Sequence, residues 1–386
     1  MKTIFENVRL ITPEEILSGS TLVLENNRIH SILSPKEKRP KGQVIRCAGK
    51  FLSSGFIDLH IHGALGHDAM EANLESWNKI SRFHASGGST HVALTTVACQ
   101  NRELEDVLAL AAQKPQLQGA ELLGIHVEGP YLSSKRPGAH DLKNLQTPNA
   151  TLNKLLLRYA TSITKITLAP ELPGALALIR SLTERGISAS AGHTAGTLDH
   201  FTKARQAGLA DATHLFNCMS SATKLGPFRQ PGMLESILAD PTCRAEMIAD
   251  GFHVAPGLMR LAYQAKGIGG LILITDATAG AGLKPGTTFH VGKHFPARVH
   301  KGYALTLDGQ SLAGSTCTMI QGIKNLVQKA SFSLPEAIQL ATFNPARALK
   351  RDHELGSLQQ GFPAHFTLFD ESFHIHQTWR DGVQIY

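Results

Sequence analysis

Hydrophobic and polar positions along the middle of the chain repeat as a short apolar run followed by a longer amphipathic segment. Such runs are typical of buried strands, and apolar residues spaced three and four apart are typical of helices. The runs predict eight strands, at residues 56–62, 89–97, 122–128, 162–169, 186–192, 210–215, 246–252 and 271–276. The amphipathic segments predict helices at residues 71–86, 102–113, 150–159, 174–185, 197–207, 232–239, 256–266, 318–331 and 335–349. Eight strands separated by helices indicate a parallel sheet, and a closed (β/α)8 TIM barrel accounts for the count better than an open sheet.

Both ends of the chain carry a different pattern, in which apolar and polar residues alternate over short stretches. This alternation is typical of strands with one buried face. It predicts strands at residues 2–12, 20–33 with a turn at 26–27, 44–47, 364–370 and 373–377. Neither end is long enough to form a core alone. We therefore predict a small β-sandwich domain built from residues 1–50 and 355–386, beside a catalytic barrel of residues 51–354.

The composition excludes several classes of protein. Hydrophobic residues make up 42% of the 386 residues, and no apolar run reaches the length of a membrane-spanning helix. The net charge of +7 is dispersed, without the basic helix or aromatic-rich motif of nucleic-acid-binding proteins. Five irregularly spaced cysteines and an N-terminus without a secretory signal indicate a cytoplasmic protein. We expect no nucleic-acid or membrane partner, and a basic surface favours a small anionic substrate.

Histidines and carboxylates gather at the predicted C-terminal ends of the strands. His60 and His62 are two residues apart on the first strand, so their side chains point to the same face. Later strands end with Glu128, His193, His214 and Asp276. In a TIM barrel these ends meet at one mouth, where active sites lie. Four imidazoles and two carboxylates converging there predict a site for a zinc-like divalent ion.

The residues around these positions form a series of blocks through nearly the whole chain. They are Gly55-Phe56-Ile57-Asp58-x-His60-x-His62-Gly63, His126-Val127-Glu128-Gly129-Pro130, Gly138-Ala139-His140, Ser190-Ala191-Gly192-His193-Thr194, Thr213-His214-Leu215-Phe216-Asn217, Ala249-Asp250-Gly251-Phe252-His253, Thr275-Asp276-Ala277-Thr278, Leu312-Ala313-Gly314-Ser315 and Asn344-Pro345-Ala346. In this order the blocks resemble N-acetylglucosamine-6-phosphate deacetylases of the amidohydrolase superfamily. The resemblance implies a metal-dependent amide hydrolase that releases acetate from N-acetyl-D-glucosamine 6-phosphate in amino-sugar catabolism.

Carried over to this chain, the resemblance assigns roles around the metal. Glu128, His193 and His214 are expected to hold the principal metal ion. Asp276 is expected to act as general base toward the attacking water and then as general acid toward the leaving amine. His140 is expected to lie beside the substrate carbonyl and to stabilise the developing negative charge.

The resemblance also implies contacts to the substrate and an assembly. The expected substrate-binding residues are Ala139, His140, Asn217, Cys218, His253, Leu312, Ala313 and Gly314. Arg229 matches an arginine that these enzymes supply to the phosphate across a dimer interface, which implies a homodimer. A guanidinium suits that role because it presents a fixed fork of donors and keeps its charge.

The pair on the first strand bears on the number of metal ions. Some of the deacetylases carry non-ligating amides at the positions of His60 and His62 and work with one metal. Because this chain has imidazoles there, we expect it to hold a second ion, with Glu128 bridging the two. The cofactor is thus one or two divalent ions per chain, zinc first, with iron, cobalt, manganese or nickel as alternatives.

The alternatives to this function are a different amidohydrolase, a different sugar substrate and a non-catalytic barrel. Dihydroorotase- or urease-like amidohydrolases need a carboxylated lysine at the end of the fourth strand, and Lys165 lies too early in that strand. The same chemistry on N-acetylgalactosamine 6-phosphate stays open, because contacts to one sugar hydroxyl cannot be read from the sequence. A remote alternative is a non-catalytic barrel scaffold, which would be expected to lack some of the ligands or the base.

Overall fold

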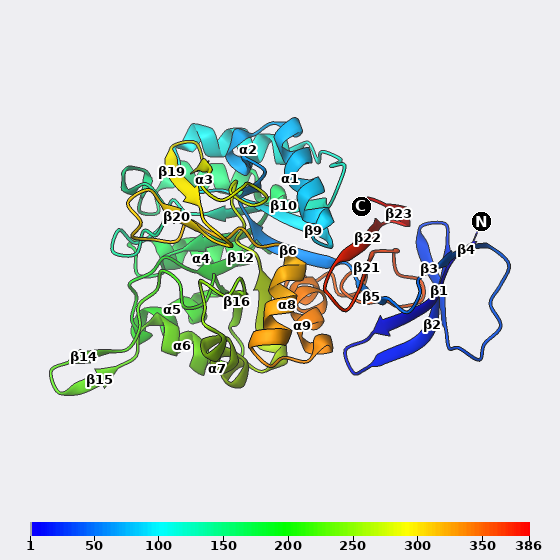
Figure 1. The fold of residues 1–386 in the computed structure, drawn as a ribbon. Coiled ribbons are helices and arrows are strands. Elements are labelled where there is room, and N and C mark those ends of the chain that lie inside the picture. Colours follow the sequence, from blue (N-terminus) through cyan, green and yellow to red (C-terminus); the bar gives the residue numbers. More distant parts are fainter. Residues whose placement is uncertain (1) are drawn as a thin grey trace.

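The computed structural model describes residues 2–386, which form a barrel and a separate sheet beside it (Figure 1). The barrel sheet is parallel and follows the chain order. Its strands are β6 (Phe56–Ile61), β9 (Ser89–Thr95), β10 (Glu121–Glu128), β11 (Ile163–Leu168), β12 (Ser188–Ala191), β13 (Asp211–Ala212), β16 (Arg244–Ile248) and β17 (Leu271–Ile274). The eight predicted strands are confirmed. Several are shorter than expected at their C-terminal ends.

The first and last barrel strands are brought together beyond the end of β17. The amide of Asp276 donates to the carbonyl of His60 over 2.9 Å, and Ile61 forms a parallel bridge with Ala277. The buried carboxylate of Asp58 on β6 accepts a 2.5 Å hydrogen bond from the hydroxyl of Thr275. These contacts close the sheet, and the predicted (β/α)8 barrel is confirmed.

Helices surround the barrel and bury their apolar faces against it (Figure 1). They are α1 (Leu74–Ser86), α2 (Asn101–Ala112), α3 (Ala150–Arg158), α4 (Ala175–Thr183), α5 (Leu198–Ala207), α6 (Met233–Ala239), α7 (Pro256–Lys266), α8 (Met319–Lys329), α9 (Leu334–Ala341) and α10 (Phe343–Ala348). The single helix expected at 335–349 is wrong, because two helices meet at Thr342. Pro345 explains the break, since its ring would clash with the carbonyl of Ala341 in a continuous helix.

The two ends of the chain form one eight-stranded sheet. Its strands are β1 (Lys2–Ile11), β2 (Ile16–Glu25), β3 (Arg28–Leu33), β4 (Gln43–Arg46), β5 (Phe51–Ser54), β21 (Phe366–Phe369), β22 (Ile375–Arg380) and β23 (Val383–Gln384). The two ends of the chain pair as predicted, but they do so through β5 and β21, and β5 was not among the predicted strands. The ring of Phe5 packs edge-on against Phe366 and Trp379 at the centre of this sheet's own core. The predicted boundaries at residues 50 and 355 stay a prediction.

Small strand elements between the barrel strands were not expected from the sequence. They are β7 (Gly63–Ala64), β8 (His67–Asp68), β14 (Thr223–Leu225), β15 (Phe228–Gln230), β18 (Thr288–Val291), β19 (Phe295–Val299) and β20 (Ala304–Thr306). The β14–β15 hairpin projects from the body at the lower left of Figure 1. Strands β18–β20 form a three-stranded sheet with a core of its own. Val291 of β18 lines the pocket described below.

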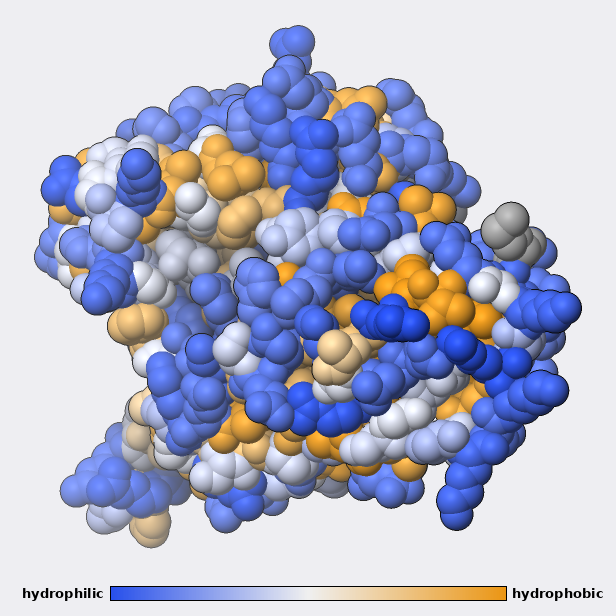
Figure 2. Space-filling model, turned by 45° about the vertical axis from the view of Figure 1, so that its right-hand side comes forward, coloured by the Kyte–Doolittle hydropathy of each residue, from blue (hydrophilic) through white to orange (hydrophobic). Residues whose placement is uncertain are grey.

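Within residues 2–386, no helix combines the length and the apolar character needed to cross a bilayer. The face shown in Figure 2 is mostly hydrophilic, with hydrophobic residues in separate groups.

Candidate active site

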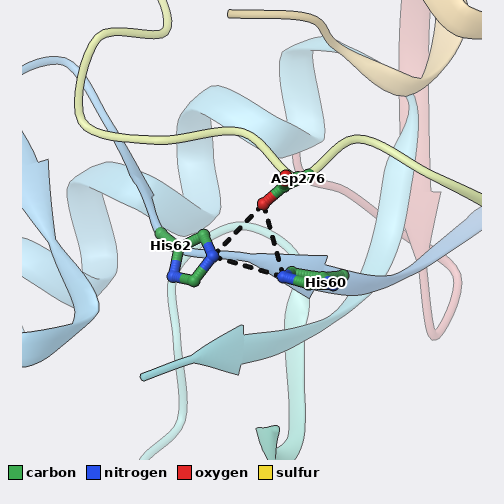
Figure 3. A group of neighbouring side chains, drawn as sticks. All are labelled: His60, His62 and Asp276. Atoms are coloured by element: carbon green, nitrogen blue, oxygen red, sulfur yellow. Dashed lines mark hydrogen bonds and ion pairs between the residues drawn. The ribbon is translucent and has the colours of Figure 1, made fainter. Parts of the chain in front are cut away.

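Three side chains from the two ends of the barrel sheet meet at the mouth (Figure 3). His60 lies on β6, His62 follows that strand, and Asp276 follows β17. The two Nε2 atoms lie 3.2 Å apart, and Asp276 Oδ1 lies 3.3 Å from His60 Nε2 and 3.2 Å from His62 Nε2. All three side chains are buried. The three atoms therefore face a common point.

A second group lies beside the first, around the last residue of β10. Oε1 of Glu128 lies 3.0 Å from Nε2 of His214 and 3.3 Å from Nε2 of His193. The two histidine Nε2 atoms are themselves 3.0 Å apart. This trio is the set expected to hold the principal metal ion, and the structure brings it together.

The carboxylate of Glu128 connects the two groups. Its other oxygen, Oε2, lies 3.3 Å from His62 Nε2 and 3.5 Å from His60 Nε2. One carboxylate thus offers one oxygen to each pair of imidazoles. This is the arrangement a bridging ligand between two ions requires.

The chemistry of this donor set fits divalent ions. Each group has two ring nitrogens about 3 Å apart with a carboxylate oxygen beside them. Imidazole nitrogens and carboxylate oxygens are ligands that zinc-like divalent ions bind. Nδ1 of His193 faces the carbonyl of Arg136 over 3.0 Å, so Nδ1 carries the proton and Nε2 keeps its lone pair. No cysteine sulfur belongs to either group of nitrogen and oxygen atoms.

Burial and charge act against each other on these groups. Burial alone lowers the pKa of His60 and His62. The facing carboxylates outweigh burial, and they raise the pKa of His60 to about 9 and that of His62 to about 10. Burial conversely raises the pKa of Glu128 and Asp276, and the surrounding histidines bring each pKa well below its usual value. Both carboxylates are therefore held in the ionised form that binds cations.

His140 differs from the other mouth histidines. Its Nδ1 accepts a 3.1 Å hydrogen bond from the amide of Ala98, so the ring proton lies on Nε2, which faces the site. Burial lowers the pKa of His140 to about 4. A neutral ring fixed in this tautomer can donate one hydrogen bond to an oxygen in the pocket.

The backbone around the mouth adopts conformations that L-residues rarely use. The φ angles of His193, His214 and Asp276 are +46°, +32° and +52°. Gly138 also has positive φ, and an added Cβ there would lie 2.8 Å from the sulfur of Cys218. The strain is of the kind that accumulates at functional sites. The predicted ends of two strands are wrong, because the chain turns away from the sheet before it reaches His214 and Asp276.

A pocket of about 200 Å³ opens over the two groups. Most of the expected substrate-binding residues line it, namely Ala139, His140, Asn217, Cys218, His253, Leu312 and Gly314. Ala313 instead is fully buried in the core under β18–β20. Arg229 lies exposed on β15 and does not line the pocket of its own chain.

Further pocket residues were missed from the sequence. Val97, Val291 and Ser311 line the pocket, and two of them come from the unpredicted segment between β17 and α8. Asp250 lies within a recognised motif but had no assigned role, and its Oδ2 lies 2.8 Å from His253 Nδ1. Burial lowers the pKa of His253, and the Asp250 carboxylate more than offsets it, so the pKa is raised overall. A carboxylate three residues before a histidine was the signal for this pair.

Comparison with known proteins gives one consistent result. Residues 51–385 match the model of the amidohydrolase family. The N-acetylglucosamine-6-phosphate deacetylase of Lysinibacillus sphaericus is 34% identical over 87% of this chain and 85% of its own length. An N-acetylgalactosamine-6-phosphate deacetylase of Escherichia coli O157:H7 is 32% identical over 97% of both chains. The crystal structure of N-acetylglucosamine-6-phosphate deacetylase from Pasteurella multocida matches with a TM-score of 0.92 at 31% identity, over 100% of this chain and 99% of that one.

Proposed function

The chain belongs to the amidohydrolase family and, within it, to the N-acetylglucosamine-6-phosphate deacetylases, and on this premise we propose how its residues carry out the reaction. The substrate is N-acetyl-D-glucosamine 6-phosphate, and the products are D-glucosamine 6-phosphate and acetate. The observation that carries the proposal is the carboxylate of Glu128 between two pairs of histidine Nε2 atoms. It supports a site for one or two divalent ions, with zinc as the first candidate and iron, cobalt, manganese or nickel as alternatives.

The ligands divide between the two positions. Glu128, His193 and His214 would hold the principal ion, and His60 and His62 would hold a second together with Glu128. When bound, such an ion makes water a better nucleophile near neutral pH and polarises the acetyl carbonyl. Every other step falls to side chains of this chain.

Asp276 acts first as general base and then as general acid. Its carboxylate faces the ligand nitrogens and reaches the pocket, where it accepts a proton from the attacking water. The water oxygen bonds to the acetyl carbon, and the carbon–nitrogen bond then breaks. Asp276 returns the proton to the leaving nitrogen, which gives the free amine and acetic acid. The acid then loses its proton to the amine or to solvent and leaves as acetate.

His140 and the rim of the pocket orient the substrate. The neutral ring of His140 donates from Nε2 to the carbonyl oxygen as negative charge develops there. Asn217 and His253 offer polar groups to the sugar, with the backbone at Ala139 and Cys218. The segment Leu312–Gly314 and the β18–β20 sheet cover the sugar and exclude water.

The phosphate contact comes from a second copy of the chain. Arg229 is exposed on the projecting β15, where it can reach a neighbouring molecule (Figure 1). On the same hairpin, Leu225 and Phe228 are 71% and 68% exposed, which supports burial of the hairpin in a homodimer. We place the enzyme in the cytoplasm, where its five free cysteines stay reduced.

The test is acetate release measured in parallel on three sugars, with the metal content of the protein determined. N-acetylglucosamine 6-phosphate should be hydrolysed far faster than unphosphorylated N-acetylglucosamine. Equal rates on both would contradict phosphate recognition. A higher kcat/KM on N-acetylgalactosamine 6-phosphate would favour the alternative substrate, to which the Escherichia coli relative also points.

A further inference from the structure

A buried ion pair lies inside the barrel below the mouth. Lys165 on β11 contacts Glu246 on β16, and their side chains are 7% and 2% exposed. Burying two charges costs several kcal/mol per ion before their attraction is counted, so such a pair is weak evidence for stability. The position of Lys165 also fits its exclusion as a carboxylated metal ligand, because its ammonium group is taken up by Glu246.

The other oxygen of Glu246 faces a metal-ligand histidine. Oε2 lies 3.4 Å from Nδ1 of His60, while Nε2 on the opposite side of the ring faces Asp276 and Glu128. An imidazole that ligates a metal ion is neutral and carries one N–H. If Nδ1 donates to Glu246, the Nε2 lone pair is directed at the mouth.

The ring of His60 has more contacts that fix its orientation than the ring of His62. Nδ1 of His62 has no hydrogen-bond partner among residues 2–386. The ring of His126 packs edge-on against His60 with centroids 4.4 Å apart, and His126 is itself fixed by Thr95 and Thr167. Of the two histidines, only His60 therefore has a carboxylate facing its Nδ1 atom.

We propose that Glu246, held in place by Lys165, is a positioning residue that fixes the orientation and tautomer of His60 and so determines whether the second metal ion binds. The inference rests on the proposed two-metal site and deepens it. Lys165 and Glu246 are both buried within their strands. Neither residue lines the mouth pocket, so neither contacts the substrate.

The test compares metal binding in the wild type, a double variant and a control variant. Each protein is freed of metal and then titrated with cobalt(II) against a competing chelator. Glu246→Gln alone would leave the Lys165 charge buried without its partner. The double variant Lys165→Met/Glu246→Leu removes both charges and the oxygen atoms that can accept from His60, and it avoids this cost. We expect one of its two ions to bind roughly 10–100-fold more weakly, the usual cost of losing such an outer partner, and the other to bind as before. The visible absorption of cobalt should lose the contribution of one site only.

Asp211→Asn serves as the matched control. Asp211 is a buried carboxylate on β13 whose Oδ1 pairs with Arg244 at 2.7 Å, and it is not among the partners of His60. Its variant should keep both ions with wild-type affinity. Equal weakening of both ions in the double variant, or of neither, would overturn the inference.

The result separates this inference from the proposed function. A wild-type protein that takes up only one ion overturns the inference, whereas acetate release can still establish the deacetylase. Conversely, selective loss of one ion in a protein without deacetylase activity supports the inference and rejects the function.

Discussion

The mouth and the floor of the barrel both concentrate polar residues, but they use them in opposite ways. At the floor, defined by Lys165, Ser188, Asp211 and Arg244, each charged group meets an opposite one: Lys165 contacts Glu246, and Arg244 pairs with Asp211. At the mouth, histidine nitrogens face one another and share carboxylates. Charged groups that pair with each other indicate a structural role. Polar groups that converge on one point without pairing indicate a binding site for a ligand.

The size of a cavity does not make this distinction. The floor residues line a pocket of about 350 Å³, larger than the mouth pocket of about 200 Å³. The backbone distinguishes the two sets of side chains, because φ is positive at His193, His214 and Asp276 in the mouth and at none of the four residues that define the floor. We therefore expect substitutions at the mouth to remove activity and leave the fold, and substitutions in the Arg244–Asp211 pair at the floor to destabilise the fold and leave activity.

The largest effect on turnover should follow Asp276→Asn. The amide keeps the size of the side chain but cannot accept the proton, so kcat should fall by roughly 10²–10⁴-fold. Metal content, measured by elemental analysis, should stay at the wild-type value because the other ligands are intact. Near-normal turnover would show that the general base is another residue.

Arg229→Ala tests whether the mouth extends to a second chain. Loss of a charged hydrogen bond worth about 1.5–3 kcal/mol should raise KM for the phosphorylated sugar by roughly 10–100-fold, with a smaller change for the unphosphorylated one. Lys224→Ala is the matched control, since Lys224 lies directly opposite Arg229 in the hairpin. Equal effects of the two substitutions would indicate a general need for positive charge.

The barrel was accessible from the sequence because its signals are local. Strand β6 reads as an apolar run, and helix α7 begins at Pro256 and ends before Gly267, so their positions follow from hydrophobic period and end signals. The convergence of Glu128 and His214 also followed, because parallel strands present their C-terminal ends at one mouth.

The unpredicted parts depend on contacts between distant segments. Strands β18–β20 are short, and the core that holds Phe289 and Val299 is completed by Ala279 and Ala313 from outside the three strands. Glu246 was missed because its partners Lys165 and His60 are far away in the chain. Such pairing is set by the closed sheet and has no local period.

His60→Asn should have a smaller effect than loss of Asp276. It removes one ligand of the second ion and leaves Glu128, His193 and His214 around the first. We expect the metal content to fall from two ions toward one and kcat/KM to fall about tenfold, which corresponds to about 1.4 kcal/mol of barrier. An unchanged content of one ion in both proteins would contradict a two-metal site.

The smallest effect on turnover should come from the floor, with Asp211→Asn. Asp211 accepts from Arg244 over 2.7 Å, and the variant leaves that guanidinium, which is 26% exposed, without its carboxylate. An incompletely buried charge that loses its partner should cost about 1–3 kcal/mol of unfolding free energy. Thermal unfolding should therefore begin at a lower temperature, while kcat/KM measured well below that temperature stays within about twofold of wild type, a barrier change under about 0.5 kcal/mol. A large loss of kcat/KM without loss of stability would mean that the floor takes part in catalysis, and the contrast between the two ends of the barrel would fail.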